Sequence, residues 1–344
     1  MPFIELGLLK TNGCGAASFI VPNKILSAPY AKVLRSILGE HHINYIRDYS
    51  SVNVFHDVAV YPVVLQVSHQ RSTSDVRMQQ MISLVDADIT NLIPASSFES
   101  GDGWDRHFQV KGHGSLLDRF KKLPLLKQQC LSVASAATVG EAYLISDFME
   151  DREHFDPANF KKFINTGTID PFTSKWGLQS TRYIKNAYQF PLVSVKNLRG
   201  LNQRRFEQAN SEKLVIGGMN LKIECYHDQG EYLAGKSTVI VLPNDKVPAL
   251  YLAAVLNSKC ASYWYRTFFK SMSLADGYLR IGHKQIGEIP IPKYEEKSCV
   301  ALLQVANQLK KYPSDSNAWL KLEQLVCSLY ELNADEIELI EAAH

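Results

Sequence analysis

The 344-residue sequence contains no apolar run close to the ~20 residues that a membrane-spanning helix needs, and no secretory leader. Its six cysteines are scattered without any short pair spacing, which excludes the usual zinc signatures and favours reduced thiols. There is no Gly-x-Ser-x-Gly turn for a serine nucleophile, and the spacing of His107 and His113 matches no metal site. We therefore expect a cytoplasmic protein that binds no metal and no membrane.

The net charge of +2 says little about partners, but the charge is unevenly distributed along the chain. Residues 152–222 contain twelve basic and five acidic side chains, whereas residues 296–344 contain four and eight. Aromatic residues such as Trp176 and Phe206 are interleaved with the basic ones. A basic and aromatic surface suits contacts with phosphates and bases, so the pattern favours nucleic acid. The alternative is a solvated surface without a partner.

The start of the chain alternates between predicted strands and helices, which indicates an α/β fold. Residues 58–67 are mostly apolar and β-branched, as in a central strand of a sheet that is covered on both faces. Gly13 and Gly15 predict a turn, and Gly39 predicts a helix end. This stretch has too few crossovers to form a doubly wound sheet alone. The other expected elements are a helix ending at residues 8–10, strands over 17–21 and 43–48, and a helix over 28–38.

Residues 248–292 combine a predicted helix with a basic loop. Apolar residues recur at helical spacing after Pro248, and the following loop contains Lys270, Ser271 and Arg280. The Ile-Pro-Ile-Pro segment at residues 289–292 ends any regular element, because proline has no backbone N–H. A helix followed by such a loop suits contact with a phosphate backbone. The alternative is a helix and loop that only complete a core.

Four features of this stretch resemble a known family. They are Leu256-Asn257-Ser258, the aromatic residues at 263–265, the glycine-containing loop, and Ile-Pro-Ile-Pro. Together they are similar to the target-recognition domain of adenine-specific DNA methyltransferases from restriction–modification systems, which have a TaqI-like specificity domain. Type I specificity subunits share the pattern. Residues 325–332, LVCSLYEL, followed by Asp335-Glu336-Ile337, resemble the ending that is common in this family.

The resemblance implies an α/β fold in which the remainder of a Rossmann-like methyltransferase sheet precedes an α/β target-recognition domain with C-terminal helices. Residues 1–95 would be the second half of the catalytic domain, and residues 96–124 a linker. Residues 125–295 would recognise DNA, and residues 296–344 would form a C-terminal helical segment.

Two motifs that the resemblance leads us to expect are missing. No Asn-Pro-Pro-Tyr tetrapeptide occurs, and Ser27-Ala28-Pro29-Tyr30 departs from it at two of four positions. The pair Gly13 and Gly15 predicts a turn rather than a cofactor loop. We therefore expect the chain to be a fragment, inactive by itself. S-adenosylmethionine would be the cofactor of the full-length enzyme and would not bind this chain alone.

The resemblance also suggests site residues. Phe55 matches a phenylalanine that stacks on the adenine after it is flipped from the duplex, although a core position is the alternative reading. Arginine pairs with guanine edges and asparagine with adenine, so the polar loop after residue 194 has the chemistry of base readout. The predicted DNA-binding residues are Lys175, Trp176, Arg199, Asn202, Arg204, Arg205, Lys270, Ser271 and Arg280.

Three functional hypotheses remain open at this point. The first is sequence-specific recognition of double-stranded DNA, together with the missing N-terminal half of a methyltransferase of a restriction–modification or phage-defence system. The second is a non-catalytic specificity subunit that docks onto separate methyltransferase chains. A paired helical repeat would be expected for it, and only one recognition segment is visible. The third is a protein-binding scaffold that uses the acidic tail.

Overall fold

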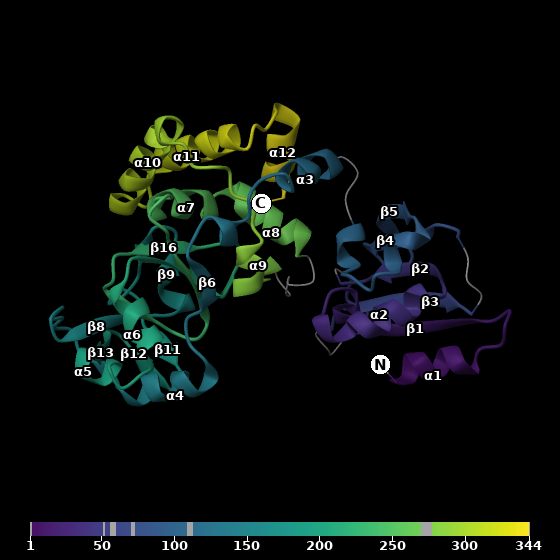
Figure 1. The fold of residues 1–344 in the computed structure, drawn as a ribbon, viewed down its shortest axis with the longest axis horizontal. Helices are drawn as coiled ribbons and strands as arrows, with labels where there is room; N and C mark the ends of the chain where they lie inside the picture. Colours follow the sequence, from purple (N-terminus) through teal and green to yellow (C-terminus); the bar gives the residue numbers. More distant parts are fainter. Residues whose placement is uncertain are drawn as a thin grey trace. The chain divides into compact units, whose positions relative to one another are not determined.

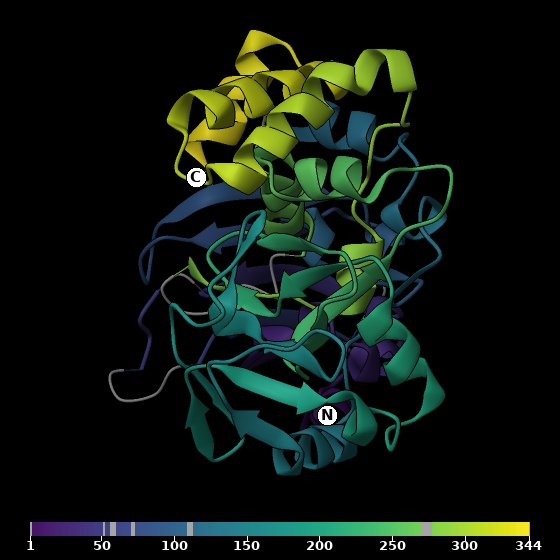
Figure 2. The same cartoon turned by 90° about the vertical axis from the view of Figure 1, so that its left-hand side faces the viewer.

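The computed structural model describes residues 2–50, 52–55, 60–69, 73–108, 113–269 and 277–343 (Figures 1 and 2). The chain divides into two compact units. The first contains Met1–Ser115 with Thr267–Ser271, and the second contains Leu116–Arg266 with Met272–His344. Mixed α/β structure with several sheets and C-terminal helices is thus confirmed.

The first unit is a five-stranded sheet in the order β1-β3-β2-β4-β5. Strand β3 is antiparallel to both β1 and β2, so β1 and β2 run in the same direction and α2 lies on the connection between them. Strand β2 is parallel to β4, and β4 is antiparallel to β5. The bounds are α1 (Pro2–Lys10), β1 (Ala16–Pro22), α2 (Lys32–Gly39), β2 (His42–Asp48), β3 (Pro62–Ser68), β4 (Val76–Met81) and β5 (Ala87–Ile93).

One face of this sheet is the core of the unit, and the other is more exposed and largely polar, with Ile20 as an exposed apolar side chain on it. In β3, Val63, Leu65 and Val67 are buried, whereas Gln66 on the opposite face donates to the Ser18 hydroxyl at 3.1 Å. The expectation that this strand is covered on both faces was wrong, because period-two alternation sends every second side chain to the polar face. Strands at the start and the Gly13–Gly15 turn are confirmed.

Residues 73–108 form regular structure that packs on the sheet of the first unit. They contain the β4–β5 hairpin and two short 3-10 helices, Ala95–Phe98 and Asp105–His107. Phe98 and Trp104 are each 1% exposed and pack edge to face, with ring centroids 5.2 Å apart. The buried Arg35 side chain donates to the carbonyl of Gly101 at 2.9 Å and so holds the loop against α2.

The second unit contains two four-stranded sheets, β17-β8-β13-β7 and β16-β14-β18-β6, and a set of helices. Figure 1 shows α10 and α11 beside α7. The helices are α3 (His113–Phe120), α4 (Val139–Asp147), α5 (Val195–Leu198), α6 (Gln203–Asn210), α7 (Ala249–Leu256), α8 (Lys259–Phe268), α9 (His283–Gly287), α10 (Glu296–Lys311), α11 (Ser316–Leu329) and α12 (Ala334–Ala342). The strands are β6 (Ser132–Ser135), β7 (Met149–Asp151), β8 (Phe160–Ile164), β9 (Ile169–Asp170), β10 (Thr173–Ser174), β11 (Thr181–Tyr183), β12 (Asn186–Tyr188), β13 (Pro191–Ser194), β14 (Lys213–Gly217), β15 (Met219–Asn220), β16 (Cys225–Asp228), β17 (Tyr232–Ala234), β18 (Thr238–Leu242) and β19 (Leu279–Arg280).

The helix predicted after Pro248 is two helices, α7 and α8, which are separated at Asn257 and Ser258. Asn257 explains the break. Its side chain accepts from the backbone N–H of Cys225 at 2.8 Å and donates to the carbonyl of Cys225 at 2.9 Å, which ties the junction to β16. Asparagine competes with the helix for such local bonds, so a sequence reading based on apolar spacing alone overlooks the interruption.

The Ile-Pro-Ile-Pro segment is fixed by hydrogen bonds to its carbonyls. The hydroxyl of Tyr330 donates to the carbonyl of Pro290 at 2.7 Å, and that of Tyr251 donates to Pro292 at 2.8 Å. The N–H of Ile291 donates to the carbonyl of Pro124 at 2.9 Å, which joins this segment to the chain that follows α3. A proline has no backbone N–H to donate, so the backbone group that Pro290 and Pro292 each bury is a carbonyl oxygen. The two tyrosine hydroxyls supply the hydrogen bonds that these buried oxygens need.

Candidate nucleic-acid interface

The polar loop after β13 is shaped by a helix cap and a buried ion pair. Asn202 caps α6, because its side chain accepts from the N–H of Arg205 at 3.1 Å and donates to the Glu141 carboxylate. Arg205 is only 5% exposed, and its Nε donates to Glu141 at 3.0 Å. Burial acts to raise the pKa of Glu141, but hydrogen bonds from Thr138 and Arg205 outweigh it and leave that pKa lowered. Asn202 and Arg205 thus shape the loop, which was not foreseen when they were predicted to contact bases.

Two other arginines of the loop face solvent. Arg199 follows α5 and stacks over the ring of Phe206, with 5.8 Å between its guanidinium carbon and the ring centroid. Arg204 lies in the first turn of α6 and is exposed. Exposed Arg182 and Lys185 come from the neighbouring β11–β12 hairpin. These four cations are available for phosphate or base contact.

Lys175 and Trp176 are both engaged within the domain. The Lys175 ammonium lies 2.7 Å from the Asp170 carboxylate. The indole N–H of Trp176 donates to the carbonyl of Pro191 at 2.9 Å, and its ring packs edge to face on Phe190. Lys162 lies 5.2 Å from the ring centroid of Trp176. The half-buried Trp176 is therefore packed within its own domain.

A basic cleft of about 450 Å³ lies beside β15, β18 and β19. Its lining includes Lys236, Arg280 and His283, together with hydroxyls such as that of Ser135, and no carboxylate among the described residues. Lys236 and Arg280 are exposed, and Nδ1 of His283 lies 3.0 Å from the Ser135 hydroxyl oxygen. Clustered cations and hydroxyls without an acidic group suit an anion such as a DNA phosphate.

The wall of this basic cleft is held by one hydroxyl and one glycine. Thr166 accepts from the N–H of Gly218 at 3.0 Å and donates to the carbonyl of Ser237 at 2.6 Å. A Cβ added to Gly218 would lie 2.1 Å from the same carbonyl oxygen, so only glycine permits the approach. The Gly218 carbonyl accepts from Ile281 at 2.9 Å, which fixes the strand that carries Arg280.

The other predicted residues lie elsewhere or outside the described chain. Phe55 belongs to the first unit and is 42% exposed, so it is not a core residue. Lys270 and Ser271 fall outside the described residues. Within the described ranges, no group of three or more histidine, cysteine or acidic side chains could hold a metal. No helix there has the length and apolarity to cross a membrane.

Gly13 and Gly15 do not fit a role in binding S-adenosylmethionine. They lie on the turn from α1 into β1. A phosphate- or nucleotide-binding glycine loop instead follows a strand and opens a helix, whose N-terminal N–H groups face the ligand. The order of elements is reversed here, so we assign no cofactor contact to these glycines.

Comparison with known families identifies the middle of the chain. Residues 169–291 match the TaqI-like C-terminal specificity domain. The chain carries a TaqI-like specificity domain. This confirms the resemblance that was read from Leu256-Asn257-Ser258 and Ile-Pro-Ile-Pro. The matched range begins at β9 and ends within Ile-Pro-Ile-Pro, and it includes α5, α6 and the strands of the basic cleft.

Solved structures give a likeness in fold. The type IIL restriction–modification enzyme MmeI, solved in complex with DNA, aligns with a TM-score of 0.50 at 13% identity over 96% of this chain and 50% of that one. The type IIG restriction endonuclease BpuSI aligns with a TM-score of 0.40 at 11% identity over 96% and 48%. The chain thus spans about half the length of these enzymes. No curated protein matches it.

Within the TaqI-like specificity domain, Lys236 and His283 were not found from the sequence. The only signal for Lys236 was its position in Gly235-Lys236-Ser237, directly after β17. A Cβ on Gly235 would lie 2.7 Å from the ring of Phe163, so the chain must turn at a glycine before Lys236. The need for a glycine at position 235 arises from packing against Phe163, so the sequence alone does not indicate it.

Proposed function

We propose that this chain recognises a specific sequence in double-stranded DNA as part of an adenine-specific DNA methyltransferase of a restriction–modification or related phage-defence system. The observation that carries the proposal is the TaqI-like specificity domain at residues 169–291. The exposed cations Arg199, Arg204 and Arg280, with Lys236 in the basic cleft, support it. Phosphate contacts by such groups contribute most of the affinity, and base contacts supply the sequence preference.

A titration of the chain with duplex DNA at several salt concentrations tests this function. We expect the logarithm of the affinity to fall linearly with the logarithm of salt concentration. Lys236→Ala and Arg280→Ala should each reduce the slope by about 1, because each removes about one phosphate contact. Lys246→Ala is the matched control, since Lys246 is exposed but lies outside the cleft. An affinity that is indifferent to salt would exclude DNA recognition by this surface.

We further propose that the first unit, with residues 1–95 at its centre, completes a Rossmann-like catalytic sheet whose other half comes from another segment. Parallel β1 and β2, joined through α2, form the crossover that such sheets use. Strand β1 is at the edge of the sheet, and its partner is known on one side only within the described residues. Leu9 of α1 and Ile20 of β1 are 74% and 52% exposed, respectively. An open edge beside apolar side chains favours a further strand and its covering helices.

In the assembled enzyme, we propose that Phe55 stacks on the flipped adenine and that the catalytic half supplies S-adenosylmethionine binding. An exposed ring near the end of β2 has the access that stacking needs. Phe55→Ala should then weaken the flipped state by ~1–3 kcal/mol. Fluorescence of 2-aminopurine at the target position measures flipping, and Phe55→Tyr should preserve it. Equal fluorescence for Phe55→Ala and the unsubstituted protein would remove this role.

A non-catalytic specificity subunit remains the second candidate. The same exposed residues of α1 and β1 favour it, because they would equally suit docking onto a separate methyltransferase chain. Co-purification with an intact methyltransferase chain, rather than with a catalytic half, would distinguish the two functions.

A further inference from the structure

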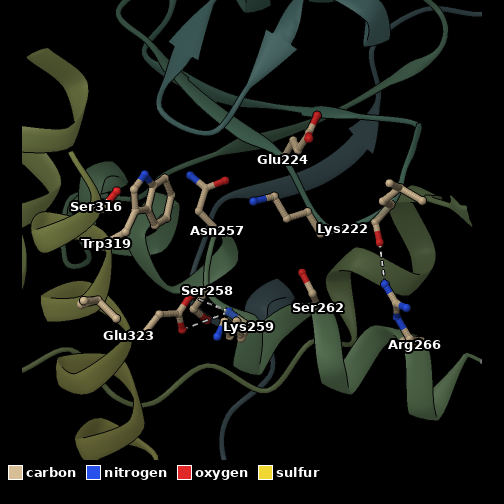
Figure 3. Close-up of a pocket in the computed structure, with 12 residues that line it drawn as sticks. Lys222, Glu224, Asn257, Ser258, Lys259, Ser262, Arg266, Ser316, Trp319 and Glu323 are labelled. Carbon is tan, nitrogen blue, oxygen red and sulfur yellow. Dashed lines mark hydrogen bonds between the residues drawn. The ribbon is translucent and has the colours of Figure 1, made fainter. Parts of the chain in front are cut away.

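A second cavity of the second unit, of about 660 Å³, lies between the C-terminal helices and the β15–β16 loop (Figure 3). It shares no lining residue with the basic cleft. Most of its lining residues are polar or charged, although Leu221, Trp319 and Leu320 contribute apolar surface, and its volume is typical of a site for a small organic molecule. In Figure 3, Trp319 and Glu323 of α11 lie on one side, with Lys222 and Arg266 on the other.

The walls of this cavity are fixed by hydrogen bonds to the backbone. The hydroxyl of Ser262 accepts from the N–H of Ile223 at 3.0 Å, and Arg266 donates to the carbonyl of Leu221 at 2.6 Å. Both bonds tie α8 to the β15–β16 loop, in addition to the Asn257 bonds to β16. A wall held in this way needs little reorganisation when a ligand enters.

Trp319 gives the cavity a flat aromatic wall. Its indole N–H donates to the carbonyl of Pro313 at 2.9 Å, so a ligand would meet the ring rather than the N–H. The Lys222 ammonium lies 5.7 Å from the ring centroid, and a stacked ligand would take its place over the ring. Phe172 packs at a centroid distance of 5.6 Å and fixes the plane of the indole. A planar ligand would gain from stacking on such a surface.

The carboxyl groups of the cavity differ in what they already bind. Glu323 accepts from the N–H of Lys259 with both oxygens, at 3.0 and 3.1 Å, and thereby caps α8. The Glu224 carboxyl makes no hydrogen bond within the described chain, although the residue is half-buried. Cations and carboxylates both line the site, so neither a free anion nor a free cation is favoured. Glu224 is therefore the polar anchor for a neutral ligand.

We propose that this cavity binds a nucleobase: a planar heteroaromatic ring that stacks on Trp319 and presents one donor beside one acceptor to the Glu224 carboxyl. A neutral carboxylic acid offers the complementary pair, an O–H donor and a C=O acceptor. Burial and the nearby Asp170 raise the pKa of Glu224 to about 7, while Lys222 and Lys175 oppose the shift. The neutral acid is thus available near neutral pH. This inference does not rest on the proposed function, because it uses different residues.

Calorimetric titration of the full chain with adenosine, inosine and purine riboside tests the inference. Adenosine and inosine each present a donor and an acceptor, whereas purine riboside lacks the donor. We expect purine riboside to bind at least ~10-fold more weakly than the other two. An unpaired adenine within a short single-stranded oligonucleotide is the second arm. Tighter binding of the strand than of adenosine would identify DNA as the source of the base, and the reverse would identify a free nucleoside.

Two substitutions of Glu224 make the test specific. Glu224→Gln keeps one donor beside one acceptor, so it should retain binding with an affinity that changes less with pH than that of the unsubstituted chain. Glu323 lines the same cavity, and burial raises its pKa to about 7 as well, so this variant isolates the contribution of Glu224. The unsubstituted chain should lose affinity as the pH rises through about 7, because the ionised carboxylate has no donor. Glu224→Leu should bind at least ~10-fold more weakly. Glu150→Gln, an exposed position outside the cavity, is the control.

Several outcomes would overturn the proposal. Equal binding of all three nucleosides, unchanged binding by Glu224→Leu, or no saturation up to ~10 mM would each do so. Trp319→Leu should weaken adenosine binding while the salt-dependent binding of duplex DNA stays unchanged. If duplex binding fails but adenosine binding behaves as expected, the function proposed above falls and this inference stands.

Discussion

The two units differ in one feature each: the second contains a fully buried ion pair, and the first carries an edge strand beside a helix with large exposed apolar side chains. The second unit buries an ion pair between Lys213 and Asp228, both of which are 0% exposed, and caps its proline segment with tyrosine hydroxyls. The first unit leaves an open sheet edge at β1 and large apolar side chains of α1 in solvent. A buried polar network whose groups are all hydrogen-bonded favours one arrangement of the core. Exposed apolar surface beside an unpaired edge strand instead indicates a surface that binds another segment or protein.

The largest expected effect concerns the buried ion pair of the second unit. Lys213→Met leaves the Asp228 carboxylate buried without its cation, although the N–H groups of Glu231 and Tyr232 still donate to it. We expect a loss of ~3–5 kcal/mol in the free energy of unfolding, measured by urea denaturation. The double substitution Lys213→Met with Asp228→Asn removes the stranded charge and should recover part of the loss. If the single variant is as stable as the unsubstituted chain, the stability of this unit does not depend on the pair.

A smaller effect is expected at the proline segment. Tyr330→Phe removes the hydroxyl that donates to the buried carbonyl of Pro290 and leaves that acceptor unsatisfied. The expected loss is about 2 kcal/mol in the free energy of unfolding. Tyr312→Phe is the matched control, because Tyr312 is 66% exposed and should tolerate the change. Equal losses in the free energy of unfolding for both variants would show that the Tyr330 hydroxyl bond does not stabilise the Ile-Pro-Ile-Pro segment.

The free energy of unfolding should also depend on pH through Glu224. Its pKa is raised in the folded chain from 4.5 to about 7, so the folded state holds the proton more tightly than the unfolded state. Stability from this group is therefore greatest below about pH 4.5 and falls as the pH rises to about 7. Relative to the unsubstituted chain, Glu224→Gln should gain about 1 kcal/mol between pH 5 and pH 8, since partial exposure reduces the full effect. A pH-independent difference in urea denaturation would contradict the raised pKa.

The smallest effect on stability is expected in the first unit. Leu9→Glu changes a side chain that is 74% exposed, so the free energy of unfolding should change by less than ~0.5 kcal/mol. The same substitution should weaken association with the proposed catalytic half at least ~10-fold, measured by analytical ultracentrifugation. Glu40→Gln, also exposed on this unit, is the control. A large loss in the free energy of unfolding with unchanged association would show that Leu9 contributes to folding of the first unit and not to a contact with another chain.

Local signals in the sequence predicted several elements well. Asparagine is a favoured helix cap, and Asn333 caps α12 by accepting from the N–H of Glu336 at 2.9 Å. The glycine turn before β1 was also found. Such features depend on neighbouring residues, so a single chain read in order reveals them.

Features that depend on distant residues were not predictable. The α7–α8 break requires the backbone of Cys225, and the burial of Arg205 requires Glu141 on another helix. Composition marks an arginine as basic, but it cannot reveal whether a carboxylate from elsewhere neutralises it. For the same reason, the sequence could not separate the exposed Arg204 from its neighbour Arg205. A candidate site that is chosen by residue type alone therefore has to be checked against the tertiary structure, which shows whether each side chain is exposed or already paired.

The contact between Pro124–Leu126 and Ile289–Ile291 brings together the two ends of a segment that contains most of the residues matching the TaqI-like specificity domain. The N–H of Leu126 donates to the carbonyl of Ile289 at 2.8 Å, so the points of entry and exit of this segment are adjacent. The segment between Leu126 and Ile289 thus leaves and rejoins the second unit at one place, and it is also joined to α11 by the Lys259–Glu323 hydrogen bonds and the Phe172–Trp319 ring contact.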